Sequence, residues 1–220
     1  MKPSRARHYK DIYPNIQGYC PFCGLESYVD PSRFTQDYDH ILNKAKYPFA
    51  AVNLKNLVPM GGICNQKYKH QTDVISAPNG QRRVYPNPYA QSFKVKITLD
   101  GSILPSASQT GTWQINLISD DPLAIPYIET WDKVFSIKDR YIQSIVKDHY
   151  NDWLRDFILI EKGNVHDVND LKARFSAKAN QFSNNIYNDK KFLRYALFSF
   201  WATCNDNRFY ESVLTQMRSL

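Results

Sequence analysis

The sequence contains no apolar run long enough to cross a bilayer, and no apolar stretch follows its basic N-terminus. A membrane-spanning helix needs about 20 consecutive apolar residues, and the nearest candidate, residues 196–202, is far shorter. Without an apolar segment behind residues 1–8, a secretory signal is not expected either. These absences predict a cytoplasmic protein without a membrane partner.

Cysteine is also scarce, because the chain of 220 residues has only four. Two of them stand in Cys20-Pro-Phe-Cys23, and in a reducing compartment this spacing favours metal binding over a disulfide. No internal repeat or low-complexity tract interrupts the chain. With 43% hydrophobic and 14% aromatic residues, the composition is ample for a packed core in one large domain or two small ones.

Acidic charge is lacking in the N-terminal half. Residues 1–100 contain 14 Lys and Arg against 7 Asp and Glu, whereas residues 101–220 contain 14 of each. The net charge of +7 is therefore confined to the half that carries the cysteine pair. A basic field of this kind is typical of proteins that bind a phosphate backbone.

Four short motifs follow one another in this basic half. They are Cys20-Pro-Phe-Cys23, Asp39-His40, Asn56-Leu57-Val58-Pro59 and Cys64-Asn65-x-x-x-Lys69. In this order they resemble the HNH endonucleases (ββα-metal nucleases), and the stretches 39–48 and 53–59 resemble a bacterial subgroup of that family. The resemblance covers residues 17–70 and is specific as a set of motifs. It implies a metal-dependent nuclease that hydrolyses DNA phosphodiester bonds.

The resemblance gives each polar residue of these motifs a role. Asp39 and Asn65 would bind one catalytic Mg²⁺ or Mn²⁺, since these ions prefer oxygen ligands. His40 would be the general base that takes a proton from the attacking water. Asn56 would hold the loop and orient His40, with the alternative that it only satisfies its own turn. Asp37 is an alternative ligand, although the adjacency of Asp and His in the family favours Asp39.

The family usually has two Cys-x-x-Cys pairs, which hold a structural zinc ion, and this chain departs from that pattern. Cys20 and Cys23 match the first pair, and Cys64 matches the second member of the second pair. The expected first member falls on Gly61. Because structural zinc takes four ligands, the sequence predicts Zn²⁺ bound by three cysteines and one further residue.

His70 is the nearest candidate for that fourth zinc ligand, and His8 is a more distant one. Cys204 lies among aromatic residues and is expected to be a buried core thiol. The alternative is a knuckle that packing holds without zinc.

Several basic residues near the motifs are candidate contacts to the phosphates of DNA. They are Lys44, Lys46, Lys67, Lys69, Arg82 and Arg83. The C-terminal part is neutral and rich in aromatic residues, which favours a protein partner or self-association. Members of the resembling subgroup are often nuclease partners of ATPases in prokaryotic antiviral defence, so a partner ATPase is expected by association.

The hydrophobic pattern predicts an α+β protein in three segments. Residues 1–75 would form the ββα-metal core with its cysteine knuckle, beginning with a basic, partly flexible lead-in over 1–16. Residues 76–120 would form a short β segment, because apolar and polar residues alternate over 93–99 and 113–117. Residues 121–220 would form a helical part.

Within the core, residues 35–42 are expected as the first strand, and a helix is expected to begin near Cys64. In the helical part, apolar residues recur every three or four positions from Val134 to Trp153, which predicts one long amphipathic helix. Asp167 and Asp189 are suitable starts for two of the helices that follow. The expected ranges of these helices are 167–185, 189–204 and 206–218.

Three functions therefore compete. The chain is a free-standing HNH endonuclease, or a nuclease subunit that is inactive without a partner ATPase, or a non-catalytic module that binds zinc and nucleic acid. The presence of Asp39, His40 and Asn65 favours the first, because a module that only binds has no need of them.

Overall fold

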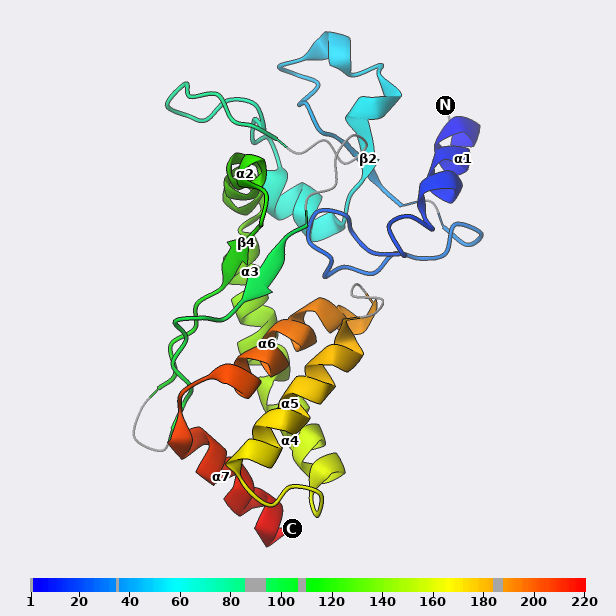
Figure 1. Ribbon diagram of the computed structural model, residues 1–220. Helices are drawn as coiled ribbons and strands as arrows, with labels where there is room; N and C mark the ends of the chain where they lie inside the picture. Colours follow the sequence, from blue (N-terminus) through cyan, green and yellow to red (C-terminus); the bar gives the residue numbers. More distant parts are fainter. Residues whose placement is uncertain (1, 35, 86–93, 107–109, 184–187) are drawn as a thin grey trace. The chain divides into compact units, whose positions relative to one another are not determined.

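The computed structural model describes the chain except residues 1, 35, 86–93, 107–109 and 184–187 (Figure 1). The described residues form an α+β protein with helices and two small antiparallel sheets. They divide into two compact units. Unit 1 comprises residues 1–94 and 119–137, and unit 2 comprises residues 95–118 and 138–220. These units do not coincide with the three segments expected from the sequence.

Unit 1 contains a two-stranded sheet and short helical turns around it. Strand β1 (Tyr38–His40) pairs antiparallel with β2 (Leu57–Pro59), and Asp39 lies opposite Val58. The other elements of the unit are α1 (Lys2–Ile12), η1 (Pro48–Ala50), η2 (Leu54–Asn56), the π-helix η3 (Cys64–Lys69), η4 (Pro122–Ala124) and α2 (Ile125–Phe135). The order strand, strand, helix over 38–69 is the order expected there, while the assignment to a ββα-metal core stays a prediction.

The chain returns to unit 1 at α2, which sequence analysis placed in the helical C-terminal part. Helix α2 packs against η3. The indole Nε1 of Trp131 donates to the carbonyl oxygen of Phe22 at 2.5 Å, and the rings of Phe22 and Phe135 lie 5.0 Å apart. Because these contacts join residues more than a hundred positions apart, α2 covers the cysteine knuckle through tertiary packing alone.

Unit 2 combines a small sheet with a helical bundle. Strand β3 (Lys96–Thr98) pairs antiparallel with β4 (Asn116–Ile118), and Phe93 of the expected strand lies outside the described residues. The helices are α3 (Ile137–Gln143), which begins at the boundary, η5 (Ser144–His149), α4 (Tyr150–Glu161), α5 (Val168–Phe182), η6 (Asn188–Lys190), α6 (Lys191–Thr203) and α7 (Asn207–Ser219). Helices α5 and α6 run side by side (Figure 1).

The core of unit 2 is aromatic. The rings of Phe157 and Phe175 stack at 4.3 Å, and Trp201 of α6 is completely buried against Phe175 and Phe198. Large rings bury much apolar area per residue, which is how short helices can hold together here. Cys204, expected in this core, is only half-buried.

Three sequence expectations are corrected by the backbone. The lead-in over residues 1–16 contains helix α1. The long helix over 134–153 is interrupted, because Ser136 adopts a left-handed conformation (φ 49°) that ends α2, and η5 is a π-helix. Asp189 does not start α6, since its own φ is 51° and α6 begins at Lys191.

The expected start at Asp167 is confirmed. Its carboxylate accepts hydrogen bonds from the amides of Asn169 and Asp170 and so caps the N-terminus of α5. Residues 184–185, the end of the expected helix, lie outside the described residues. None of the helices described here is long and apolar enough to span a membrane.

Candidate metal centre and the Asp39-His40 strand

The two cysteines of the Cys-x-x-Cys motif lie in a tight knuckle. The carbonyl oxygen of Cys20 accepts hydrogen bonds from the amides of Cys23 and Gly24, and Gly24 has a φ of 66°, which favours glycine. The amide of Cys20 in turn donates to the carbonyl of Glu26 at 2.8 Å. The knuckle therefore turns both thiols to one side and brings Glu26 back beside them.

Cys64 completes a cluster of four possible ligands. The Sγ atoms of Cys20, Cys23 and Cys64 and a carboxylate oxygen of Glu26 all lie within 4.8 Å of one another, and the three thiols are buried. A tetrahedral zinc with Zn–S bonds of ~2.3 Å separates its ligand atoms by roughly 3.8 Å. The cluster is therefore consistent with a zinc site, in which all four positions are filled by side chains.

Glu26 stands where sequence analysis expected a histidine. His70, at the end of η3, is exposed and is not among the clustered ligands. The structure also explains how Glu26 fits, because a Cβ atom at Gly61 would lie 2.5 Å from the Glu26 carboxylate. The glycine at the position of the missing cysteine thus leaves the space that the carboxylate fills. The one sequence signal was its position three residues after Cys23.

Backbone amides support the ligands. The Glu26 carboxylate accepts hydrogen bonds from the amides of Ile63 (3.1 Å) and Cys64 (3.3 Å) at the start of η3. The amide of Gly61 donates to the Cys20 sulfur at 3.4 Å, and the amide of Leu25 donates to the Cys23 sulfur at the same distance. Such donors favour negative charge on their acceptors, which suits thiolates and a carboxylate around a cation.

The thiols share their protons unequally. Burial raises the pKa of Cys20, but hydrogen bonds from Cys23, Cys64 and Tyr28 outweigh it and hold that pKa well below its usual range. Hydrogen bonds to Cys20 and Cys23, together with burial, raise the pKa of Cys64. The Cys20 thiolate therefore forms more readily than the Cys64 thiolate.

We expect Glu26→Gln to lower the affinity for zinc by about 10- to 100-fold, since the charge of one ligand is lost, while His70→Ala leaves it unchanged. The measurement is a competition titration against a chromophoric zinc chelator. The double variant Glu26→Ala, Gly61→Cys should recover affinity by supplying a fourth thiolate in the vacated space. If zinc binding were weakened in His70→Ala and not in Glu26→Gln, His70 and not Glu26 would be the fourth ligand.

The strand β1 places Asp39 and His40 on opposite faces. One face of β1 looks toward η3, because the Asp39 Oδ2 lies 2.7 Å from the Lys69 Nζ. The side chain of Lys69 is 1% exposed. This lysine is therefore not on the surface, where the sequence led us to expect it as a contact for phosphate. Asn65 precedes Lys69 by four residues and therefore lies on the same side of the helix.

The His40 ring is held by the loop between β1 and β2. Its Nε2–H donates to the carbonyl oxygen of Ala51 at 3.2 Å, which leaves Nδ1 as the nitrogen with a lone pair. Asn56 is buried and closes this loop, because its Nδ2 donates to the carbonyls of Leu42 and Ala50 and its Oδ1 accepts from the Leu42 amide. Asn56 therefore braces the loop rather than its own turn.

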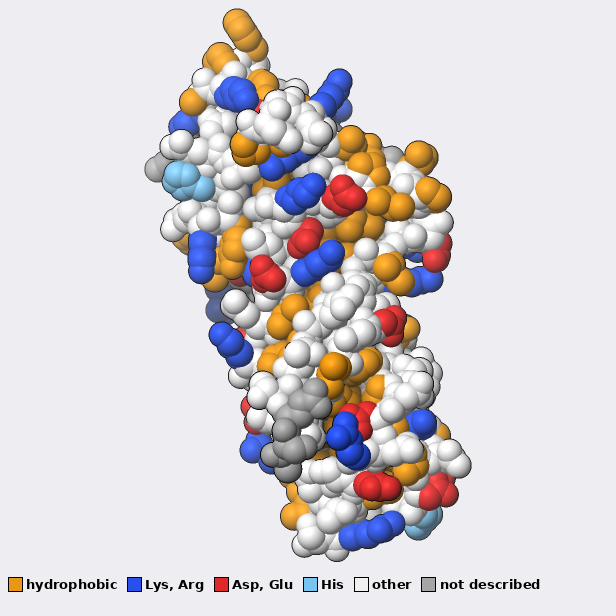
Figure 2. Space-filling model, turned by 90° about the vertical axis from the view of Figure 1, so that its left-hand side faces the viewer, with side chains coloured by type: hydrophobic (Ala, Val, Ile, Leu, Met, Phe, Trp, Pro, Cys, Tyr) orange, Lys and Arg blue, Asp and Glu red, His pale blue; other side chains and the backbone are white. Residues whose placement is uncertain are grey.

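The other predicted phosphate contacts differ in their surroundings. Lys44 and Lys67 are exposed. Lys46 forms an ion pair with Asp73 at 2.5 Å, and this hydrogen bond raises the pKa of Lys46. Arg82 is exposed, and Arg83 is half-buried with its Nη1 donating to the Asp73 carbonyl. On the face shown in Figure 2, basic side chains are interspersed with acidic and apolar ones and form no continuous patch.

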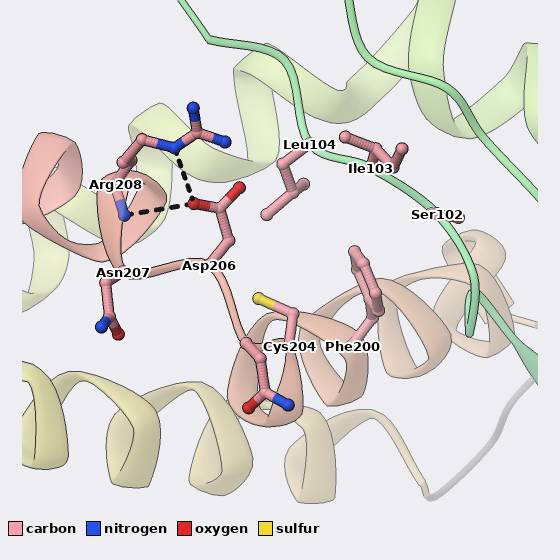
Figure 3. A pocket seen from close by; sticks show the side chains of 9 residues that line it. Ser102, Ile103, Leu104, Phe200, Cys204, Asp206, Asn207 and Arg208 are labelled. Atoms are coloured by element: carbon pink, nitrogen blue, oxygen red, sulfur yellow. Dashed lines mark hydrogen bonds and ion pairs between the residues drawn. The ribbon is translucent and has the colours of Figure 1, made fainter.

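Unit 2 has a cavity of its own, of about 420 Å³. Figure 3 shows Cys204, Asp206 and Arg208 around it. Asp206 accepts from the amides of Arg208 and Phe209 and so caps α7, and its carboxylate lies 3.7 Å from the Arg208 Nε. The Cys204 sulfur lies 3.3 Å from the Tyr210 hydroxyl. The carboxylate of Asp206, which lines this cavity, is therefore already used to cap α7.

No family model matches the chain, and neither does any curated protein or solved structure.

Proposed function

We propose that the chain is a metal-dependent endonuclease of the HNH type that hydrolyses DNA. The observation that supports this most is the position of His40, whose ring is oriented by the Ala51 carbonyl on a loop braced by Asn56. A histidine held in this tautomer has Nδ1 available to accept a proton from water. The expected role in antiviral defence rests on the resemblance alone.

Asp39 and Asn65 are the proposed ligands of Mg²⁺ or Mn²⁺. The Lys69 ammonium lies 2.7 Å from Asp39 Oδ2 and holds the carboxylate in place by ion pairing, while this buried oxygen has no hydrogen-bond partner in the described part of the chain. A carboxylate and an amide oxygen are suitable ligands for such an ion. When bound, it would stabilise the negative charge that develops on the phosphate.

The first test is the cleavage of supercoiled plasmid by the purified protein. We expect nicked or linear DNA with Mg²⁺ or Mn²⁺ and none when both ions are omitted, because the metal supplies the charge stabilisation. Omitting the ions is a better control than a chelator, which would also remove zinc. Intact plasmid in the presence of both ions, with DNA binding retained, would contradict an independently active nuclease.

The Lys69–Asp39 ion pair also supports a second candidate. A cation already neutralises the proposed ligand, as would suit a module that binds nucleic acid without cutting it, or a subunit that a partner ATPase must rearrange. Mixing the chain with an ATPase encoded beside it distinguishes the binding module from the ATPase-dependent subunit, because only the ATPase-dependent subunit would gain cleavage activity.

A further inference from the structure

Three large apolar side chains lie in the solvent over residues 49–54, in the loop that joins β1 to β2. Phe49 is 93% exposed, Val52 is 88% exposed and Leu54 is 59% exposed. Phe49 and Val52 are the two most exposed large apolar side chains in the described part of the chain. Single exposed apolar residues are common on protein surfaces, but apolar side chains that gather on one segment mark an interaction site.

The loop holds these side chains on an ordered frame. The amide of Ala51 donates to the carbonyl of Pro48 at 3.1 Å, and the amide of Asn53 donates to the carbonyl of Ala50 at 3.1 Å. The side chain of the buried Asn56 also donates to the Ala50 carbonyl. Because the backbone is already ordered, little conformational entropy would be lost when the exposed side chains contact a ligand.

The exposed apolar side chains do not fill the empty space beside the loop. A cavity of about 570 Å³ borders the loop, where Ala50 and Asn53 line it together with Arg83 and Tyr85. None of the three exposed apolar side chains is among its lining residues. They are therefore available to a partner outside the chain.

The charge around the loop favours nucleic acid as that partner. Residues 41–72 contain five lysines and no aspartate or glutamate. Lys44 and Lys55, which flank the apolar side chains in the sequence, are exposed. A stable protein interface buries about 800 Å² on each partner, which is more than three side chains can supply. A small apolar tip between lysines instead suits a duplex, whose phosphates attract the lysines while the tip reaches the bases.

The same loop contacts the proposed general base. Ala51 lies between Phe49 and Val52 in the chain, and its carbonyl oxygen accepts the hydrogen bond from the His40 Nε2 at 3.2 Å. A duplex held by the apolar side chains would therefore present its backbone next to His40.

We propose that this loop is a wedge for duplex DNA, in which Phe49 inserts between two neighbouring base pairs while Lys44 and Lys55 contact the phosphates on either side. The inference rests on the proposed nuclease function and gives its substrate class. Opening a base step costs free energy, and the cost is smaller where a mismatch has already weakened pairing and stacking. The chain therefore prefers duplexes with a mismatch or another weakened step and cuts them beside it.

The test is fluorescence anisotropy with a short labelled duplex that carries one central mismatch, beside the same duplex fully paired, without Mg²⁺ or Mn²⁺. We expect the mismatched duplex to bind about tenfold tighter and Phe49→Ala to remove most of this difference, because one aromatic stacking contact is lost. Phe49→Trp should keep the difference, since its larger ring also stacks on bases. Lys44→Gln and Lys55→Gln should each lower the salt slope by about 0.9 for both duplexes.

Ile160→Ala is the control, because Ile160 is an exposed apolar residue of unit 2, and it should bind both duplexes like the original chain. Phe49→Ala should keep its melting temperature, since the lost side chain is almost fully exposed. Equal affinity of the original chain for the two duplexes, no binding of either, or an unchanged difference in Phe49→Ala would overturn the inference. So would binding to phosphatidylserine vesicles, or dimers in mass photometry, that Phe49→Ala abolishes while DNA binding stays the same.

Plasmid cleavage separates this inference from the nuclease proposal. Cleavage by a chain that shows no Phe49-dependent preference for the mismatch would reject only the wedge. A Phe49-dependent preference in a chain that cleaves no DNA, even with the partner present, would reject only the nuclease.

Discussion

His40→Ala should lower plasmid cleavage by about 10²- to 10⁴-fold, the usual contribution of a positioned general base. The Ala51 carbonyl binds the Nε2–H of His40, so the nitrogen that accepts the proton is lost with the ring and water cannot substitute for its fixed position. DNA binding should change less than about threefold, because one imidazole ring adds little to a contact dominated by phosphate charge. Cleavage rates and binding isotherms under the same salt conditions make the comparison.

The matched control is His166→Ala, an exposed histidine of unit 2, which should cleave like the original chain. Parallel loss of cleavage, DNA affinity and melting temperature in His40→Ala would show that the ring is structural. Retained cleavage would show that another group activates the water. Either result would remove His40 from the proposed mechanism.

Cys20→Ser should release the zinc and unfold or loosen unit 1. A zinc ion in this cluster would join Cys20 and Cys23 to Cys64 at the start of η3. Its loss would free both segments and the contact of Phe22 with Phe135 of α2. Structural zinc contributes about 10–16 kcal/mol to the folding of small zinc domains, and we expect a fall in melting temperature on the order of 10 °C or more. Elemental analysis should show zinc well below the original content.

Cys204→Ser provides the control, since this thiol belongs to unit 2 and lies outside the cluster. It should keep its zinc. The prediction fails if Cys20→Ser retains zinc and melts at the same temperature as the original chain, and the knuckle would then be held by packing. A metal-free preparation of the original chain should reproduce the behaviour of Cys20→Ser and recover when zinc is added.

Local features of unit 1 could be read from the sequence because they depend on near neighbours. The Cys-x-x-Cys spacing requires a tight turn, and Gly24 supplies the left-handed residue that ends it. Cys20 and Cys23 were identified for this reason, whereas Cys64 was identified through the resemblance of its motif. The fourth was missed because a glutamate is usually a solvated surface residue, and only the space beside Gly61 reveals its role.

The sequence by itself determined the α+β class, the knuckle, the strand that bears Asp39 and His40, and the Asp167 cap. Each depends on residues within a few positions of one another. Tertiary structure alone decided that Lys69 is buried against Asp39, that α2 packs on the knuckle, and that Arg83 and Tyr85 line one cavity. These outcomes depend on contacts between segments that are distant in the sequence. Such contacts can pair and bury a charged side chain such as Lys69, which by itself would prefer water.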